Sequence, residues 1–115
     1  GDKRGRELGY PTANQSMDGY VRPPYGIYAV RVQLPSGQQM DGVANLGVRP
    51  MFEVEEPLLE TFIFDFSGDL YGENLQVSLM KHLRDEKKFA DIDALVLQMK
   101  QDETRARQFL KELTT

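Results

Sequence analysis

The chain has 115 residues, of which 40% are hydrophobic and 28% charged, and it contains no cysteine. This length predicts a single domain over residues 1–115 with a core that needs no covalent cross-link, and the absence of cysteine excludes disulfides, cysteine-ligated zinc and thiol catalysis. The formal net charge of -4 argues against a nucleic-acid partner, because phosphate backbones attract clustered cations. No apolar run has membrane-spanning length and no signal peptide is visible, so we expect a cytoplasmic protein without a membrane partner.

The predicted elements begin with an irregular segment, because residues 1–25 are punctuated by glycine and proline. Residues 27–34 alternate in polarity and predict a half-buried strand. Pro35-Ser36-Gly37 predicts a hairpin turn, and residues 38–48 predict the returning strand. Glycines within that strand indicate a bulge or the close approach of another backbone.

Arg49-Pro50 is expected to end the returning strand, and residues 53–57 to form an acidic, exposed loop. Residues 58–66 are apolar at most positions of both faces, as in a barrel strand that is covered by a helix. After a turn at residues 67–69, residues 75–80 alternate as a last strand.

From Asp91 the hydrophobic period changes to that of a helix, which predicts a long C-terminal helix with one apolar stripe. Asp91 is suited to be its N-cap, and Glu103 and Arg107 have the spacing of an ion pair. Strands followed by one helix predict a mostly β fold, a small antiparallel barrel closed by the C-terminal helix.

The run from Gly5 to Asn14 has the composition of a phosphate and metal site. Gly5 and Gly9 tolerate positive φ, which lets backbone N–H groups converge on a phosphate, and Arg6 adds positive charge. Thr12 and Asn14 offer the neutral oxygens that Mg²⁺ accepts beside substrate phosphates. The alternatives are that residues 11–14 form an ordinary turn and that Arg6 is a solvated surface residue.

Glu60 is a candidate general base. It shares strand parity with Phe62, Phe64 and Phe66, and a carboxylate on an aromatic face has to be paired, liganded or near the mouth of the barrel. Such desolvation would raise its pKa toward the range that suits a base. The alternative is a glutamate at a strand end that reaches solvent.

Three further residues are candidate ligand contacts. Asn45 precedes the predicted bend at Gly47. It could line the mouth of the barrel, or it could only stabilise the turn. Tyr71 lies in the turn of residues 69–72 and could stack on a base. Arg84 belongs to a mixed charge run, most of which is expected to be solvated, although its planar guanidinium suits carbonyls and phosphates.

In order along the chain, residues 5–14, 42–50, 59–66, 69–72 and 83–89 resemble the motifs of riboflavin kinases (flavokinases). The resemblance implies a six-stranded Greek-key barrel that transfers phosphate from ATP to riboflavin with Mg²⁺, giving FMN and ADP. It also implies a parent chain in which this domain is fused to an FMN adenylyltransferase, as in bacterial FAD synthetases.

The resemblance also implies roles for individual residues. Glu60 would be the base on the ribityl hydroxyl, Arg84 would contact the flavin, and Thr12 and Asn14 would bind the metal. Nucleotide contacts are expected at Gly5, Arg6, Gly9, Pro11, Thr12, Asn14, Asn45 and Tyr71.

Two features depart from the family pattern. Met51 stands where many members have threonine, and the strand that usually precedes the first glycine is missing, so an unpaired sheet edge is expected. Two alternatives therefore stay open, a flavin- or nucleotide-binding barrel without catalysis and a fragment whose site is incomplete. An oligonucleotide-binding barrel is disfavoured, since there is no basic aromatic face.

Overall fold

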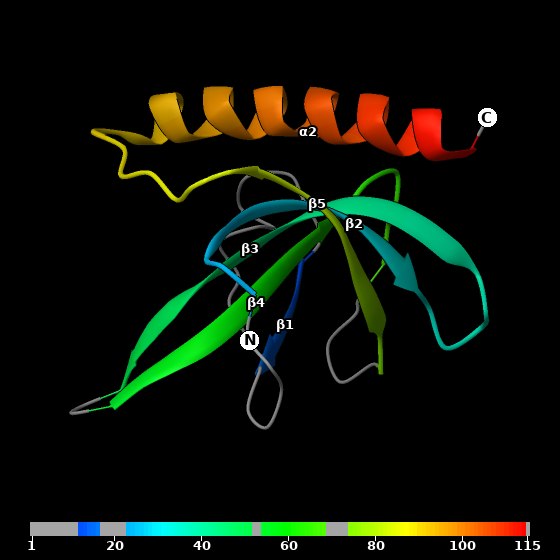
Figure 1. Ribbon diagram of the computed structural model, residues 1–115, viewed down its shortest axis with the longest axis horizontal. Coiled ribbons are helices and arrows are strands. Elements are labelled where there is room, and N and C mark those ends of the chain that lie inside the picture. The colour runs from blue at the N-terminus through cyan, green and yellow to red at the C-terminus, as the bar shows by residue number, and fades with distance from the viewer. Residues whose placement is uncertain (1–11, 17–22, 52–53, 69–73, 115) are drawn as a thin grey trace.

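The structure, a computed structural model, describes residues 12–16, 23–51, 54–68 and 74–114. Its elements are β1 (Thr12–Ser16), β2 (Gly26–Gln33), β3 (Gln39–Met51), β4 (Val54–Ile63), β5 (Gln76–Arg84) and α2 (Ile92–Thr114). The strands form one antiparallel sheet in the order β1-β4-β3-β2-β5, and α2 lies across it (Figure 1). The predicted mostly β fold with a C-terminal helix is confirmed. Closure into a six-stranded barrel stays a prediction.

The two faces of the sheet bury two separate cores. Along β2, Tyr28, Val30 and Val32 pack into one cluster, whereas Ile27 and Ala29 pack into a second cluster with the helix. The predicted alternation is confirmed, but the expected half-burial was wrong because α2 covers the second face. Full burial of an aliphatic side chain contributes roughly 1.5–3 kcal/mol, so both faces stabilise the fold.

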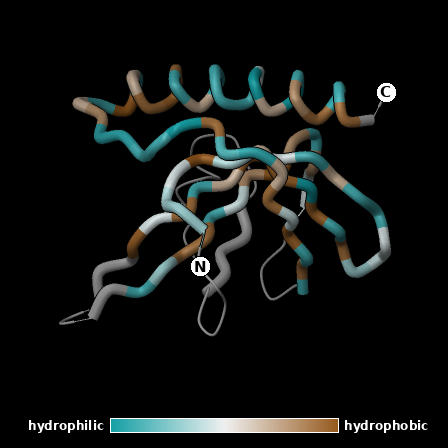
Figure 2. Tube along the Cα trace, in the orientation of Figure 1, coloured by the Kyte–Doolittle hydropathy of each residue, from teal (hydrophilic) through white to brown (hydrophobic). Residues whose placement is uncertain are grey.

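Helix α2 begins where the sequence predicts. Asp91 Oδ1 accepts a hydrogen bond from Ala94 N at 2.8 Å, as an N-cap does. Hydrophobic and hydrophilic positions alternate along the helix (Figure 2), and Ala106 and Leu110 are buried against the sheet. The predicted apolar stripe runs from Ile92 to Leu113, and its two end residues are not buried, because Ile92 is 60% and Leu113 46% exposed.

Polar contacts fix the C-terminal half of the helix on the sheet. Arg107 donates to Glu103 at 2.7 Å, which confirms the predicted pair, and to both carboxylate oxygens of Asp65 at 2.9 and 3.1 Å. Arg31 Nη2 on β2 donates to Leu110 O at 3.1 Å. None of the helical parts described is long and apolar enough to cross a membrane.

The hairpin of β3 and β4 is longer than predicted. Arg49-Pro50 does not end β3, and residues 54–57 of the expected loop belong to β4; residue 53 lies outside the described residues. Pairing of β3 with β2 stops at Leu46 and pairing of β4 with β1 stops at Leu58. Beyond those points each strand has one partner among the described residues, so a proline there need not remove a ladder hydrogen bond.

Strand β1 occupies part of the segment that was predicted to be irregular. Residues 12–16 pair with β4 in antiparallel register, and that part of the prediction was wrong. Residues 1–11 and 17–22 lie outside the described residues. The strand is polar, so its conformation is set by pairing with β4 and not by a hydrophobic pattern.

Two irregularities in β5 change its register against β2. Val30 faces Leu79 and Ala29 faces Lys81, so one residue of β5 is unpaired between them; the same happens between Tyr28 and Ile27. These are the marks of β-bulges, which re-aim side chains. The predicted last strand therefore continues beyond residue 80 to Arg84, which lies directly opposite Ile27.

Candidate active site

The register of the sheet brings four predicted site residues into one row. Asn14 on β1 lies opposite Glu60, and Glu60 lies opposite Asn45 on β3. Asn45 lies opposite Ile27, and Ile27 lies opposite Arg84 at the end of β5. Directly opposed residues of antiparallel strands are neighbours on one face, so motifs that are far apart in the sequence meet across the sheet.

A cleft of ≈ 610 Å³ lies over the part of this row from Glu60 to Arg84, between the sheet, residues 86–91 and the N-terminal half of α2. Asn45, Glu60 and Arg84 line it. Most of its wall is apolar; the lining includes Ile27, Val43, Phe62, Phe89, Leu95 and Met99. A largely apolar cavity with a few convergent polar groups is the common form of a small-molecule site.

Glu60 lies within β4 and not at its end, and it is partly buried at the cleft. The aromatic face predicted around it is smaller than expected. Phe62 and Phe64 pack in the cluster beside the helix, but the strand ends at Ile63 and Phe66 packs against the other core. A turn follows at once because Asp65 adopts a left-handed φ of 57°.

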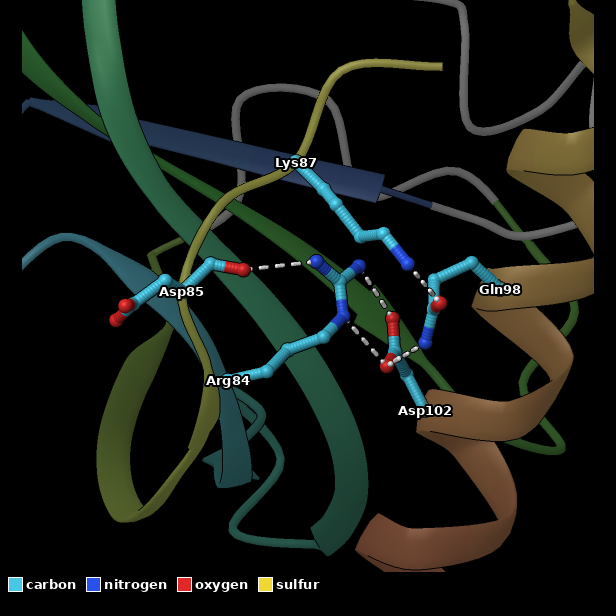
Figure 3. A network of polar contacts seen from close by, with 5 residues as sticks. All are labelled: Arg84, Asp85, Lys87, Gln98 and Asp102. Carbon is cyan, nitrogen blue, oxygen red and sulfur yellow. Dashed lines mark hydrogen bonds and ion pairs between the residues drawn. The ribbon is translucent and has the colours of Figure 1, made fainter. Parts of the chain in front are cut away.

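Arg84 is held by the helix (Figure 3). Its Nε and Nη2 donate to the two carboxylate oxygens of Asp102, each at 2.8 Å, and its Nη1 donates to Asp85 O at 2.9 Å. Gln98 Nε2 donates to Asp102 Oδ1 at 3.1 Å, and Lys87 Nζ donates to Gln98 Oε1 at 3.2 Å. Most of the charge run is exposed, as expected, and Arg84 ties it to α2.

Asp102 lines the cleft and pairs with Arg84, and it was not among the predicted site residues. It is 2% exposed and lies three residues after Met99 and four before Ala106, within the buried stripe of the helix. An aspartate at an apolar stripe position has to be paired. That position was the available signal in the sequence.

Asn45 carries an unsatisfied polar atom. Within the parts of the chain that the structure describes, its buried Oδ1 has no hydrogen-bond partner. A buried acceptor without a partner costs about 1–3 kcal/mol, and functional sites are where such groups are retained. Nearby, Glu86 lies at the cleft with its side-chain carboxylate against Gly47, whereas the predicted close approach of a backbone occurs at Gly42, against Phe62 O.

Several predicted site residues have no described environment. Gly5, Arg6, Gly9, Pro11 and Tyr71 lie outside the described residues. Thr12 and Asn14 are placed by their backbone on β1, two positions apart, with Phe62 and Glu60 as their partners on β4.

The fold is that of a small β domain with a cleft between its sheet and its C-terminal helix. The family model described as "Flavokinase: Riboflavin kinase" matches residues 1–110, and the chain belongs to the riboflavin kinase family.

Similar proteins include bifunctional riboflavin kinase/FMN adenylyltransferases. The relative from Haemophilus influenzae is 42% identical over 109 residues, with 95% of this chain and 35% of the relative covered. The relative from Bacillus subtilis is 38% identical over 117 residues, with 98% of this chain and 37% of the relative covered. This chain therefore spans about a third of the length of these relatives.

The fold is also similar to a crystal structure described as a macrolide-efflux protein from Streptococcus pneumoniae. The TM-score is 0.84 at 41% sequence identity, over 93% of this chain and 35% of that one. That description belongs to the other protein. The agreement in fold extends over most of the 115 residues.

Proposed function

We propose that residues 1–115 form the riboflavin kinase domain of a longer protein. The reaction is transfer of the terminal phosphoryl group of ATP to the ribityl 5′-hydroxyl of riboflavin, which gives FMN and ADP. The observation that carries the proposal is that Glu60, Asn45 and Arg84 line one cleft in register across the sheet, with Asn14 paired to Glu60 on β1. The family and the names of its bifunctional relatives support this substrate pair.

The cleft is suited to the flavin ring. Its volume of ≈ 610 Å³ lies within the usual range for small-ligand sites, and its apolar walls match a flat aromatic system. In this arrangement Arg84 faces the ring and Asn45 lies between the ring and Glu60. The ribityl chain then runs along the row toward β1.

Glu60 is the proposed general base. It takes the proton of the ribityl hydroxyl as the oxygen attacks the terminal phosphorus, and the leaving group is ADP. Phosphoryl transfer depends mainly on positioning and on neutralisation of charge, so the hydroxyl has to lie between the base and the phosphate. Because Asn14 is the direct neighbour of Glu60 across the sheet, the motif for the phosphate side adjoins the proposed base.

Mg²⁺ fits the donor types on β1. Thr12 and Asn14 are neutral oxygen donors two positions apart, and Mg²⁺ needs one or two protein oxygens when phosphates and water supply the others. When bound, the ion would neutralise charge on the phosphates. Nucleotide contacts are assigned, on the motif, to Gly5, Arg6, Gly9, Pro11, Thr12, Asn14, Asn45 and Tyr71.

The finer architecture of the family completes the proposal. We expect the described strands to be part of a six-stranded Greek-key barrel, and the parent chain to carry an FMN adenylyltransferase domain. The expected location is the cytoplasm, where ATP is available. A crystal structure of the chain with ADP and FMN tests the barrel and the placement of both ligands.

Kinase activity is tested by incubation with riboflavin and Mg-ATP and separation of FMN by chromatography. Glu60→Gln should keep riboflavin binding and lose turnover by about 10²-fold or more, the usual scale for a general base. Glu56→Gln is the matched control, since Glu56 lies on the same strand with the same parity and does not line the cleft. Near-normal turnover of Glu60→Gln would remove Glu60 from this role.

Thr12→Ala tests the metal assignment. The variant should weaken binding of Mg-ATP and leave riboflavin binding unchanged, because the lost oxygen belongs to the phosphate side. Wild-type chain that binds riboflavin but forms no FMN would instead identify a binding module.

A further inference from the structure

We propose that Asp102 is a positioning residue. It holds the guanidinium of Arg84 in the orientation that recognises two adjacent hydrogen-bond acceptors on the ring in the cleft. The inference rests on the proposed function, because it takes the flavin ring as the occupant of the cleft. It assigns the basis of ring selectivity to a buried carboxylate on α2.

The guanidinium of Arg84 has a fixed geometry, and the protein uses part of it. An arginine side chain carries five N–H groups in a planar fork. The carboxylate of Asp102 accepts hydrogen bonds from Nε and Nη2 and so occupies the side of the guanidinium plane that carries these two nitrogens. The backbone oxygen of Asp85 accepts a hydrogen bond from Nη1. Figure 3 shows the guanidinium bracketed between these two residues.

Two N–H groups of the Arg84 guanidinium are left for a ligand. Nη1 and Nη2 each keep one further N–H group beyond the hydrogen bonds to Asp85 and Asp102 within the described residues. These two groups form the outer end of the plane and point in parallel, away from the aliphatic stem. Arg84 lines the cleft, so this end is the part of the residue that can meet a ligand.

Asp102 itself is held in place, and this makes the orientation of Arg84 rigid. The side chain of Asp102 is 3% exposed, that of Arg84 is 16% exposed, and Gln98 donates a further hydrogen bond to Asp102. A buried, bidentate pair with a satisfied third contact leaves the guanidinium little freedom to rotate. Orientation is therefore set before the ligand arrives, which reduces the entropy lost on binding.

The edges of the flavin ring differ in their pattern of hydrogen-bond donors and acceptors. Two parallel donors fit two neighbouring acceptors and are mismatched to an edge that alternates acceptors with a donor. The isoalloxazine ring has two such acceptor pairs, N1 with the C2 carbonyl and N5 with the C4 carbonyl. Its third polar edge places the N3–H donor between the two carbonyls. Arg84 should accept either acceptor pair and reject the third edge.

The test measures dissociation constants of the 115-residue chain for riboflavin, 1-deazariboflavin and 5-deazariboflavin by quenching of flavin fluorescence. Each analogue replaces one ring nitrogen by C–H. Wild type should bind one analogue about tenfold more weakly than riboflavin, because one charge-assisted hydrogen bond is lost. The analogue that is penalised identifies the edge in contact.

Asp102→Asn and Arg84→Lys should both abolish this discrimination and raise the dissociation constant of riboflavin about tenfold, with the KM for Mg-ATP unchanged within about twofold. Asp65→Asn is the matched control, because Asp65 forms a bidentate pair with Arg107 on the same helix and does not line the cleft. It should retain the discrimination.

Equal binding of all three flavins by wild type would overturn the inference, whatever the variants do. So would an Asp102→Asn chain that keeps the wild-type ratio between riboflavin and the penalised analogue, because a merely structural aspartate leaves that ratio unchanged. FMN formation is measured separately. Wild type that discriminates between the flavins but forms no FMN would contradict the kinase proposal and leave the role of Asp102 intact.

Discussion

Thr61 offers a direct test of the energetics of the sheet. Its side chain is fully buried on β4, and within the described residues its hydroxyl has no hydrogen-bond partner. An unsatisfied buried hydroxyl costs about 1–3 kcal/mol. Valine has nearly the same shape and favours strands equally, so Thr61→Val should remove the penalty without opening a cavity.

We expect Thr61→Val to raise the free energy of unfolding by about 1–2 kcal/mol and the Tm by roughly 5 °C. Urea and thermal denaturation measure both. Thr104→Val is the control, since Thr104 is exposed on α2 and its hydroxyl donates to Lys100 O at 3.0 Å. That variant should stay within about 0.5 kcal/mol of wild type.

A Thr61→Val protein that is no more stable than wild type would show that the hydroxyl is satisfied and that the reasoning is wrong. Turnover gives a second reading. Thr61 and Glu60 are consecutive on β4, so their side chains point to opposite faces. Thr61→Val should therefore leave FMN formation unchanged.

Three further predictions concern stability. Leu110→Ala should lower the free energy of unfolding by about 2–5 kcal/mol, whereas Leu113→Ala at the exposed end of the helix should change it by less than about 0.5 kcal/mol; urea denaturation compares them. Gly42→Ala should destabilise by about 1–3 kcal/mol because its Cβ would lie 2.5 Å from the backbone oxygen of Phe62, and an unchanged urea midpoint would contradict this. Hydrogen bonding to Arg107 lowers the pKa of Asp65, so this pair stabilises the fold above the unfolded-state pKa and the effect is lost as pH falls through the folded-state pKa. Asp65→Asn should therefore flatten the acid limb of a plot of Tm against pH, less so at high salt.

Much of the fold could be predicted because its signals are local. The alternation in β2, the turn at Pro35-Ser36-Gly37, the Asp91 cap and the Glu103–Arg107 pair each depend on residues close in the sequence. Gly37 has a φ of 92°, a conformation that its lack of a side chain permits.

The missed elements depend on pairing between distant segments. Strand β1 is polar and exists because β4 offers it an edge. Proline at position 50 is tolerated because, in the part of the chain that the structure describes, β3 pairs there with β4 alone. Neither fact is visible in a local pattern. The same holds for the site. The chemistry of Glu60, Asn45 and Arg84 is visible in the sequence, but their alignment and the pairing of Arg84 with Asp102 depend on the register of distant strands and on the helix.

The double bulge of β5 makes strand length, and not only side-chain identity, a determinant of ligand contact. With regular pairing from Leu79 onward, Arg84 would face residue 25 and not Ile27, a displacement of about 7 Å along β2. A one-residue deletion between residues 80 and 83 that kept both irregularities would place Arg84 opposite Tyr28, on the other face of the sheet and away from Asp102. Homologues that share every motif but differ by one residue in this strand are therefore expected to differ in the flavins that they accept.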